Sequence, residues 1–335
     1  MNKKTGRIFG FLALLALIAV SCQAPKPQSL RITPENFLEL DISAEGSVNQ
    51  PVGFIWAADS RSLLVLTGGG ITHLNAQTLE EEKISEFTYL VSTGQISPDG
   101  KTLAFSEDDR SISLQELDTL KEKLSISPGY FLNSISFSPD GKTLLTSSYD
   151  DLKVDLWDAE SGKFIKSLTG FETAAPVYSA RFAKNGRYVV WNSRGRIQLS
   201  DSESGQIGMP FDHEDWVTSW ALSTDGKQLA TSAASTVQGH FVPTILIWDT
   251  STGETRMLMT SEETYDGLAF CPETYLVAVL EGKVITIIDL DQFNKPAELF
   301  LPGGPITSMA FSPDGAALAA FNADGDFAVW RVPGK

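Results

Sequence analysis

Residues 137–144 read FSPDGKTL, and residues 96–103 read ISPDGKTL. The same turn returns as FSPDG at 311–315, near the end of the chain. In each copy Pro suits the second position of a type I turn, Asp tolerates the third, and Gly takes the left-handed position that follows. Apolar residues alternate on both sides of the turn. The stretch therefore predicts a β-hairpin that recurs along the chain.

The hairpin is the centre of a longer repeat. Four further, degenerate copies keep the apolar residue that precedes the turn. We use this residue as the marker of a copy, and the chain has seven markers: Trp56, Ile96, Phe137, Phe182, Leu222, Phe270 and Phe311. They recur every forty to forty-eight residues, whereas helical tetratricopeptide repeats are about 34 residues long and kelch blades are near 50. Seven copies of one supersecondary unit are predicted.

Each copy contains two more strands after the hairpin. A third strand such as 154–158 (VDLWD) is followed by a Gly-containing turn and a fourth strand such as 163–168 (KFIKSL). Four short strands per period, with no helical periodicity, predict a four-stranded antiparallel blade. We therefore expect an all-β protein, a seven-bladed β-propeller, over residues 36–335.

The third strands resemble those of the WD-repeat (Trp-Asp) β-propellers. The signature pair stands at 157–158 and 248–249, with worn copies at 330–331 (WR) and 199–201 (LSD). The resemblance covers almost all of 36–335 and implies a protein-binding propeller. The family's Gly-His element survives only as Asp212-His213, so its His–Ser/Thr–Asp–Trp hydrogen-bond tetrad is expected to be incomplete in each blade. Six-bladed propellers of the TolB-like type share the Ser-Pro-Asp-Gly turn.

The seventh copy lacks a fourth strand of its own, because the chain stops at Lys335. Residues 37–42 (FLELDI) alternate apolar and acidic side chains ahead of the first copy. If this N-terminal segment pairs with 327–332, the ring is closed and blade seven has no unpaired edge. A loose N-terminal extension is the alternative.

The amino terminus is typical of a targeting segment. Lys3, Lys4 and Arg7 precede an uncharged run over 8–20, which is too short for a membrane span of about 20 residues and fits a secretory signal peptide. Residues 19–22 (AVSC) resemble the lipobox of bacterial lipoproteins. This implies a signal peptide over 1–21, a lipidated Cys22 and a tether over 22–35. The alternative is an ordinary signal peptide with an incidental cysteine.

Such an anchor implies an extracytoplasmic protein held to a bacterial membrane through its lipid. Gln23 stands where lipoproteins kept on the inner membrane often carry Asp, so that retention signal is absent.

Composition limits the other partners. The 335 residues carry a net charge of −16, which argues against a nucleic-acid partner and against docking of the folded part onto anionic lipid. We expect a monomer, with Cys271 as a buried, inert thiol.

Catalytic motifs were not found. The sequence has no Gly-x-Ser-x-Gly elbow, phosphate loop, His-Glu-x-x-His or Cys-x-x-Cys. His73, His213 and His240 fall in different blades, and the acidic pairs at 108–109 and 150–151 suit tight turns, so we expect no catalytic residues, no metal and no cofactor. Two alternatives stay open: a hydrolase or lactonase that uses carboxylates around a central channel, and an envelope assembly component of the TolB-like kind.

The remaining candidate functional residues lie in the loops that join blades and in the loops between second and third strands. In the WD-repeat family these two sets of loops lie on one face of the ring. Aromatic side chains there are common interface anchors. The candidate binding residues are Tyr130, Phe131, Tyr149, His213, Trp216, His240 and Phe241. The fifth copy is the longest, and its extra length at 233–244 (AASTVQGHFVPT) is expected to be a surface loop at the centre of this face. The interpretation is a lipid-anchored, non-catalytic scaffold that binds a protein or peptide.

Replacing the acylated cysteine tests the anchor. Because the thiol of Cys22 would carry the lipid, Cys22→Ser should abolish labelling by radioactive palmitate and release a soluble or uncleaved protein. Metabolic labelling followed by membrane fractionation measures both effects. A wild-type protein that takes up no lipid would show that the anchor is wrong.

Overall fold

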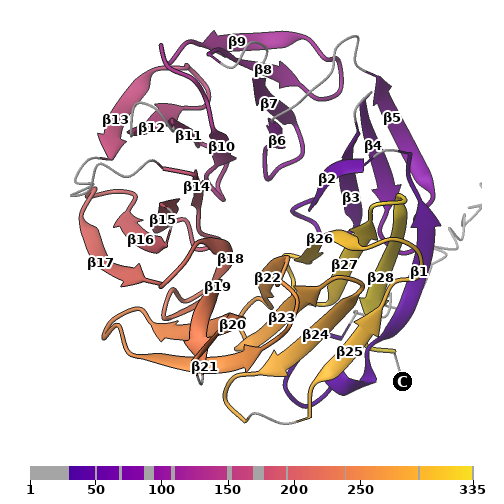
Figure 1. Cartoon of the computed structure of the whole chain (residues 1–335). Helices are drawn as coiled ribbons and strands as arrows, with labels where there is room; N and C mark the ends of the chain where they lie inside the picture. Colours follow the sequence, from indigo (N-terminus) through magenta and orange to yellow (C-terminus); the bar gives the residue numbers. More distant parts are fainter. Residues whose placement is uncertain are drawn as a thin grey trace, which may run out of the picture.

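The computed structural model describes most of the chain beyond the tether. The described residues are 30–49, 51–67, 70–86, 94–106, 110–148, 153–168, 177–193, 195–237, 239–292 and 295–333. The predicted signal peptide, Cys22 and most of the predicted tether lie outside them. Within them, seven four-stranded antiparallel sheets form a ring (Figure 1). This confirms the all-β, seven-bladed β-propeller. No helix in the described part of the chain is long and apolar enough to cross a membrane.

The first four blades follow the chain from the innermost to the outermost strand. Blade 1 contains β2 (Pro51–Trp56), β3 (Ser62–Thr67), β4 (Gly70–Asn75) and β5 (Glu81–Glu86). Blade 2 contains β6 (Gly94–Ile96), β7 (Thr102–Ser106), β8 (Ile112–Glu116) and β9 (Glu122–Ile126). Blade 3 contains β10 (Ser134–Phe137), β11 (Thr143–Ser148), β12 (Lys153–Asp158) and β13 (Phe164–Leu168). Blade 4 contains β14 (Ser179–Phe182), β15 (Tyr188–Ser193), β16 (Arg196–Asp201) and β17 (Ile207–Asp212).

The last three blades complete the ring. Blade 5 contains β18 (Val217–Leu222), β19 (Gln228–Val237), β20 (His240–Asp249) and β21 (Thr255–Thr260). Blade 6 contains β22 (Gly267–Phe270), β23 (Leu276–Glu281), β24 (Val284–Asp289) and β25 (Ala297–Phe300). Blade 7 contains β26 (Ile306–Phe311), β27 (Ala317–Asn322), β28 (Asp326–Arg331) and, as its outermost strand, β1 (Asp41–Ser47).

The ring has two distinct faces, because an antiparallel chain reverses at alternate ends of successive strands. We call one the turn face: it carries the turns between first and second strands and between third and fourth strands. We call the other the loop face: it carries the loops between second and third strands and the connections between blades. The loop face is the face that the sequence analysis selects for binding.

The recurrent turn is built as its residues predict. In blade 3 the Ser138 hydroxyl donates to Asp140 Oδ1 at 2.6 Å, and the N–H of Thr143 donates to Ser138 Oγ at 2.9 Å. Gly141 has a φ of 71°, the left-handed conformation that glycine adopts at little cost. The Ser138 hydroxyl and then the Lys142 N–H lower the pKa of Asp140, because both favour its ionised form. The aspartates of these turns therefore serve the hairpins.

Side chains of the innermost strands tie each blade to the next. Gln95 Oε1 accepts a hydrogen bond from the N–H of Phe137 at 2.6 Å, and Ser136 Oγ accepts one from the N–H of Phe182 at 3.1 Å. Trp56 Nε1 donates to the carbonyl of Ala310 at 2.9 Å, which joins blade 1 to blade 7. The innermost strands have no further strand to pair with, so these bonds satisfy backbone groups that would otherwise be left unmade.

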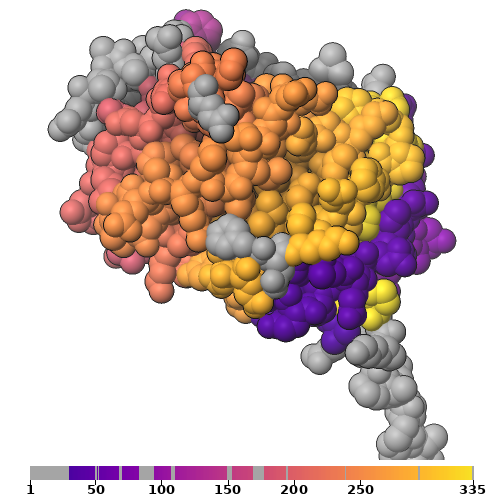
Figure 2. All heavy atoms as spheres, turned by 60° about the horizontal axis from the view of Figure 1, so that its bottom comes forward, coloured from indigo at the N-terminus to yellow at the C-terminus, as the bar shows by residue number. Residues whose placement is uncertain are grey.

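The ring is closed by the N-terminus, as predicted, but by a different segment. β1 pairs antiparallel with β28, from Asp41 opposite Arg331 to Ser47 opposite Asp326. The expected strand over 37–42 is therefore wrong for most of its length: Phe37–Glu39 forms a 3-10 turn, η1. Its apolar pattern has another cause, since Phe37 is fully buried in the cluster between blades 6 and 7 that includes Ile32 and Trp330. Figure 2 shows the indigo N-terminal segment lying against the yellow C-terminal blade.

The same seam encloses the second cysteine. Cys271 is buried, with Sγ 3.7 Å from the carbonyl oxygen of Ile32, and burial raises the pKa of its thiol to about 11. The structure thus confirms that Cys271 is buried, and a thiol with so high a pKa is a poor nucleophile near neutral pH.

Truncating Phe37 should weaken the closure of the ring. Phe37→Ala removes a fully buried ring, so we expect the free energy of unfolding to fall by about 3–5 kcal/mol. Leu38 is 55% exposed, and Leu38→Ala is the matched control, with an expected change of about 0.5 kcal/mol or less. Urea denaturation of both variants measures the difference. Equal losses would contradict a role for Phe37 in the seam.

Candidate protein-binding surface

Blade 5 differs from the other blades in the length of its second and third strands. β19 and β20 each span ten residues and stay paired from Gln228 opposite Asp249 to Val237 opposite His240. The segment 233–244 was expected to be a loop, and this is wrong. Its small and β-branched residues continue both strands, and Gly239, with a φ of 83°, permits a tight reversal at the tip.

The end of this hairpin extends beyond the four-stranded blade. β18 pairs with β19 only as far as Ala233, and β21 pairs with β20 only as far as Thr244. We call the two-stranded part beyond them, residues 234–237 and 240–243, the arm. It rises on the loop face because it is the connection between second and third strands. Pro243 has no backbone N–H, so one edge of the arm has fewer donors with which a further strand could pair.

Two contacts hold the arm against neighbouring loops. Glu214 Oε2 accepts hydrogen bonds from both the N–H and the hydroxyl of Thr236, each at 2.7 Å. On the other edge, the N–H of Ser261 donates to the carbonyl of Pro243 at 3.1 Å. The role of Glu214 could not be predicted without knowing that the 233–244 segment is a hairpin.

Three of the aromatic residues predicted to bind a partner are exposed on the loop face: Trp216, Phe241 and Phe131. Phe241, in the arm, is 56% exposed, and Trp216 is 44% exposed in the same short loop as Glu214. The Trp216 ring lies against Tyr178, with centroids 4.6 Å apart. Since Glu214 is bonded to the arm, the structure brings Trp216, Phe241 and the exposed His240 to one region around blade 5.

Phe131 lies in the connection between blades 2 and 3. Its ring is 47% exposed, and the Arg110 guanidinium lies 4.1 Å from the ring centroid. A cation above an aromatic face is attracted by the ring quadrupole and fixes the orientation of both groups. Phe131 is therefore a second exposed anchor on the loop face, separated along the ring from the arm.

His213 is placed inside the blade and not at the surface. The ring is half-buried and packs edge-on against Trp248, with centroids 5.1 Å apart. His213 Nε2 lies 2.8 Å from Thr231 Oγ1, which also accepts a bond from Trp248 Nε1 at 2.8 Å. His213 Nδ1 lies 3.2 Å from the carbonyl of Gly195. These partners suit a neutral ring with its proton on Nδ1, and burial lowers the pKa of His213 accordingly.

Tyr130 has the corresponding place in blade 3. It is only 4% exposed, and its hydroxyl lies 2.7 Å from Thr146 Oγ1 and donates to Asp155 Oδ2 at 2.8 Å. Trp157 Nε1 donates to Thr146 Oγ1 at 2.9 Å, as Trp248 does to Thr231 in blade 5. A ring, a threonine and a tryptophan are thus linked in both blades. Tyr130 and His213 contact side chains of the strands within their blades. The structure does not bring either of them to the exposed surface.

Tyr149 lies outside the described residues, as do the acidic pairs at 108–109 and 150–151. Among the described loops on the loop face of blades 5 to 7, acids outnumber cations. The acids are Glu214, Asp215, Glu262, Glu263, Asp266 and Asp324, and the cation is Lys283. These loops therefore carry an excess of acidic side chains.

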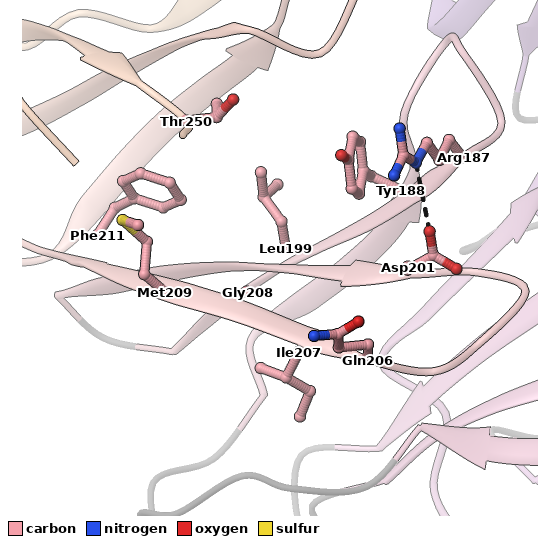
Figure 3. A pocket seen from close by; sticks show the side chains of 10 residues that line it. All are labelled: Arg187, Tyr188, Leu199, Asp201, Gln206, Ile207, Gly208, Met209, Phe211 and Thr250. Carbon is pink, nitrogen blue, oxygen red and sulfur yellow. Dashed lines mark hydrogen bonds and ion pairs between the residues drawn. The ribbon is translucent and has the colours of Figure 1, made fainter. Parts of the chain in front are cut away.

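Two grooves among the described residues lie elsewhere. One, of about 190 Å³, is formed by β16 and β17 with Thr250 of blade 5, and Figure 3 shows Leu199, Met209 and Phe211 along it and the Arg187–Asp201 ion pair at one end. Another, of about 380 Å³, lies at the turn face between Asp225 and Tyr275. Neither is lined by a histidine or cysteine, and no group of three or more metal-ligating side chains is found in the described part of the chain.

Comparison with protein families gives an independent result. The family described as "WD domain, G-beta repeat" (WD40) matches residues 121–158 and 298–331. The chain contains WD40 repeats. Each matched WD40 repeat combines the outermost strand of one blade with the inner three strands of the next: β9 with β10 to β12, and β25 with β26 to β28. Each such unit therefore spans a seam between two blades.

Two curated relatives share part of the sequence. Telomerase protein component 1 from Mus musculus is 28% identical over 138 residues, which is 41% of this chain and 5% of that protein. Telomerase protein component 1 from Rattus norvegicus gives the same values. The chain spans about a twentieth of the length of these relatives.

The neutral ring of His213 should make stability depend on pH. Below about pH 6.5 the unfolded chain gains a proton at this position that the folded chain resists, so unfolding becomes easier as the pH falls. His213→Gln cannot titrate and should lose less stability between about pH 7 and pH 5, a difference of at most about 1.4 kcal/mol per pH unit. Thermal melting measures it, with His240→Gln as the exposed control. An unchanged pH slope in His213→Gln would contradict this role.

Proposed function

We propose that this protein is a non-catalytic scaffold that binds a partner protein through the loop face, with the arm of blade 5 at the centre of the site. WD40 propellers typically mediate protein–protein interactions. The observation that carries the proposal is the arm itself, a paired ribbon that no other described blade has. Such a ribbon is ordered before binding, so little conformational entropy is lost when a partner docks.

The exposed groups on this face suit a protein partner. Phe241 and Trp216 offer aromatic surface of the kind that dominates interface energies, and Phe131 offers another anchor. The acidic loops around the arm favour a partner segment that carries Lys or Arg, because opposite charge speeds encounter and excludes wrong partners. A basic protein segment with apolar side chains is therefore the partner that this surface fits.

The innermost strands weigh against the enzyme alternative. A hydrolase or lactonase that uses carboxylates at the channel would need Asp or Glu there, and the seven innermost strands carry neither. Arg181 is their one charged residue. The innermost strands therefore lack the general acid and base groups that a hydrolase or lactonase would need there.

We also propose that Cys22 carries a lipid and holds the protein to a bacterial membrane on the extracytoplasmic side. The segment ahead of β1 supports a definite orientation. Ile32 donates its N–H to the carbonyl of Gly315 at 2.8 Å, and Arg31 pairs with Glu273, so this segment runs along the turn face. A tether from residue 29 back to Cys22 would leave from that face, and the loop face would point away from the membrane. β28 is covered by β1, so blade 7 has four strands like the other blades, and a second copy of the chain is not needed to complete it.

A photo-crosslinking residue in place of Phe241 tests the site. In cells, it should capture the partner protein, because the side chain at 241 would contact it directly. The matched control is Phe164, which is 54% exposed but lies on the outermost strand of blade 3. Capture of one protein from both positions, or from 164 alone, would place binding on another surface.

Removal of the arm gives the quantitative test. Replacing residues 235–242 by Asn-Gly keeps the pairs that β18 and β21 make and supplies a tight hairpin turn. The melting temperature should stay close to that of the wild type, while affinity for the captured partner should fall at least tenfold, about 1.4 kcal/mol. A folded variant with full affinity would overturn the proposal.

A further inference from the structure

Arg181 occupies an unusual place in the ring. It lies on β14, the innermost strand of blade 4, and it is the one charged residue on the seven innermost strands. The residues at the same position before the marker in the other blades are Ile55, Gln95, Ser136, Ala221, Ala269 and Ala310. Arg181 nevertheless stays exposed, so water reaches it along the axis of the ring. Figure 1 shows β14 and β18 side by side at the inner side of the ring.

The guanidinium of Arg181 is held in a fixed position. Its Nη2 donates to the carbonyl of Trp220, on β18, at 3.0 Å, and its central carbon lies 3.9 Å from the centroid of the Trp220 ring. Stacking on an indole leaves the edge of the guanidinium free to donate. Nε and Nη1 make no hydrogen bond to any described residue, and Arg181 makes no ion pair with one.

A second cation lies close by. Lys184 follows β14 in the turn to β15, where blades 2, 3 and 7 have Pro98, Pro139 and Pro313. It makes no hydrogen bond or ion pair with the described residues. Lys184 is exposed and stands three residues after Arg181, just beyond the end of β14, so both cations lie toward the turn face.

No carboxylate offsets these two charges. Among the described residues, no acidic side chain forms an ion pair with Arg181. This stands out in a chain with 42 acidic residues and 26 basic ones. The nearest acids of the repeat, such as Asp140 and Asp225, are engaged by the serines of their own turns, at 2.6 and 2.7 Å. An apolar side chain would cover Trp220 without the cost of an uncompensated charge, so packing alone does not explain Arg181.

We propose that Arg181 and Lys184 form a binding site for a small oxyanion, a phosphate or carboxylate group, at the centre of the turn face. Nη2 has a second hydrogen, so together with Nε or Nη1 it can donate two parallel hydrogen bonds to one such group, and the flexible ammonium of Lys184 can add a third donor. The site lies on the opposite side of the ring from the arm. It is therefore independent of the protein-binding surface.

The test uses the folded protein with inorganic phosphate and with malonate as probes, at constant ionic strength so that general screening is equal. Isothermal titration and thermal melting should both report binding to the wild type. Lys184→Ala should fold normally and bind about tenfold more weakly, and Lys184→Glu should bind neither probe. Lys142→Ala removes an exposed lysine from the corresponding turn of blade 3 and should bind as the wild type does.

Arg181→Gln should abolish binding while it keeps a polar group beside Trp220. If that variant does not fold, the two Lys184 variants decide the question. Preference for phosphate over malonate, or the reverse, identifies the class of anion. Absence of saturable binding to the wild type would overturn the proposal, as would equal binding by Lys184→Glu and Lys142→Ala.

Discussion

The ring depends on the pairing of β1 with β28. A propeller blade can bury its apolar faces only against two neighbouring blades, and blade 7 obtains its outermost strand from the other end of the chain. Without this strand, β28 would present a row of unpaired backbone groups at the rim. The pairing also carries Phe37 and Ile32 into the seam between blades 6 and 7, where they pack with Trp330. One strand thus closes the hydrogen-bond ladder and completes the core.

Backbone groups at the inner edges of the blades also need hydrogen-bond partners. Gln95, Ser136 and Trp56 each bond a backbone group of the neighbouring blade. Farther out, Thr146 and Thr231 link a ring to the third-strand tryptophan within their blades. Tyr130 and His213 have corresponding places in this arrangement, because each makes the contact to a threonine hydroxyl in its own blade. The positions that can vary freely are therefore the loops and the arm, and function is expected there.

The two faces of the disc have different chemistry. The loop face bears exposed aromatic side chains and acidic loops around a rigid arm held by Glu214. The turn face bears repeated Ser–Asp turns whose carboxylates are already bonded, and among them stand the two cations of blade 4. The N-terminal segment also runs along the turn face. The two binding sites that we propose, one for a protein and one for a small anion, would therefore use opposite faces of the ring.

The sequence by itself determined the number of blades, the strands within them and the hairpin turns, because Ser-Pro-Asp-Gly and Trp-Asp act through local hydrogen bonds at fixed spacing. It indicated that the N-terminus closes the ring, but the apolar pattern of 37–40 reflects burial of Phe37 and not a strand. The tertiary structure alone decided that 233–244 is a paired ribbon, that Tyr130 and His213 face inward, and that Arg181 stacks on Trp220. The places of Tyr130, His213 and Arg181 depend on partners 16 to 39 residues away in the chain, which no local pattern encodes. The ribbon, in contrast, is a local hairpin, and its extension beyond the blade is evident only because the neighbouring strands end at Ala233 and Thr244.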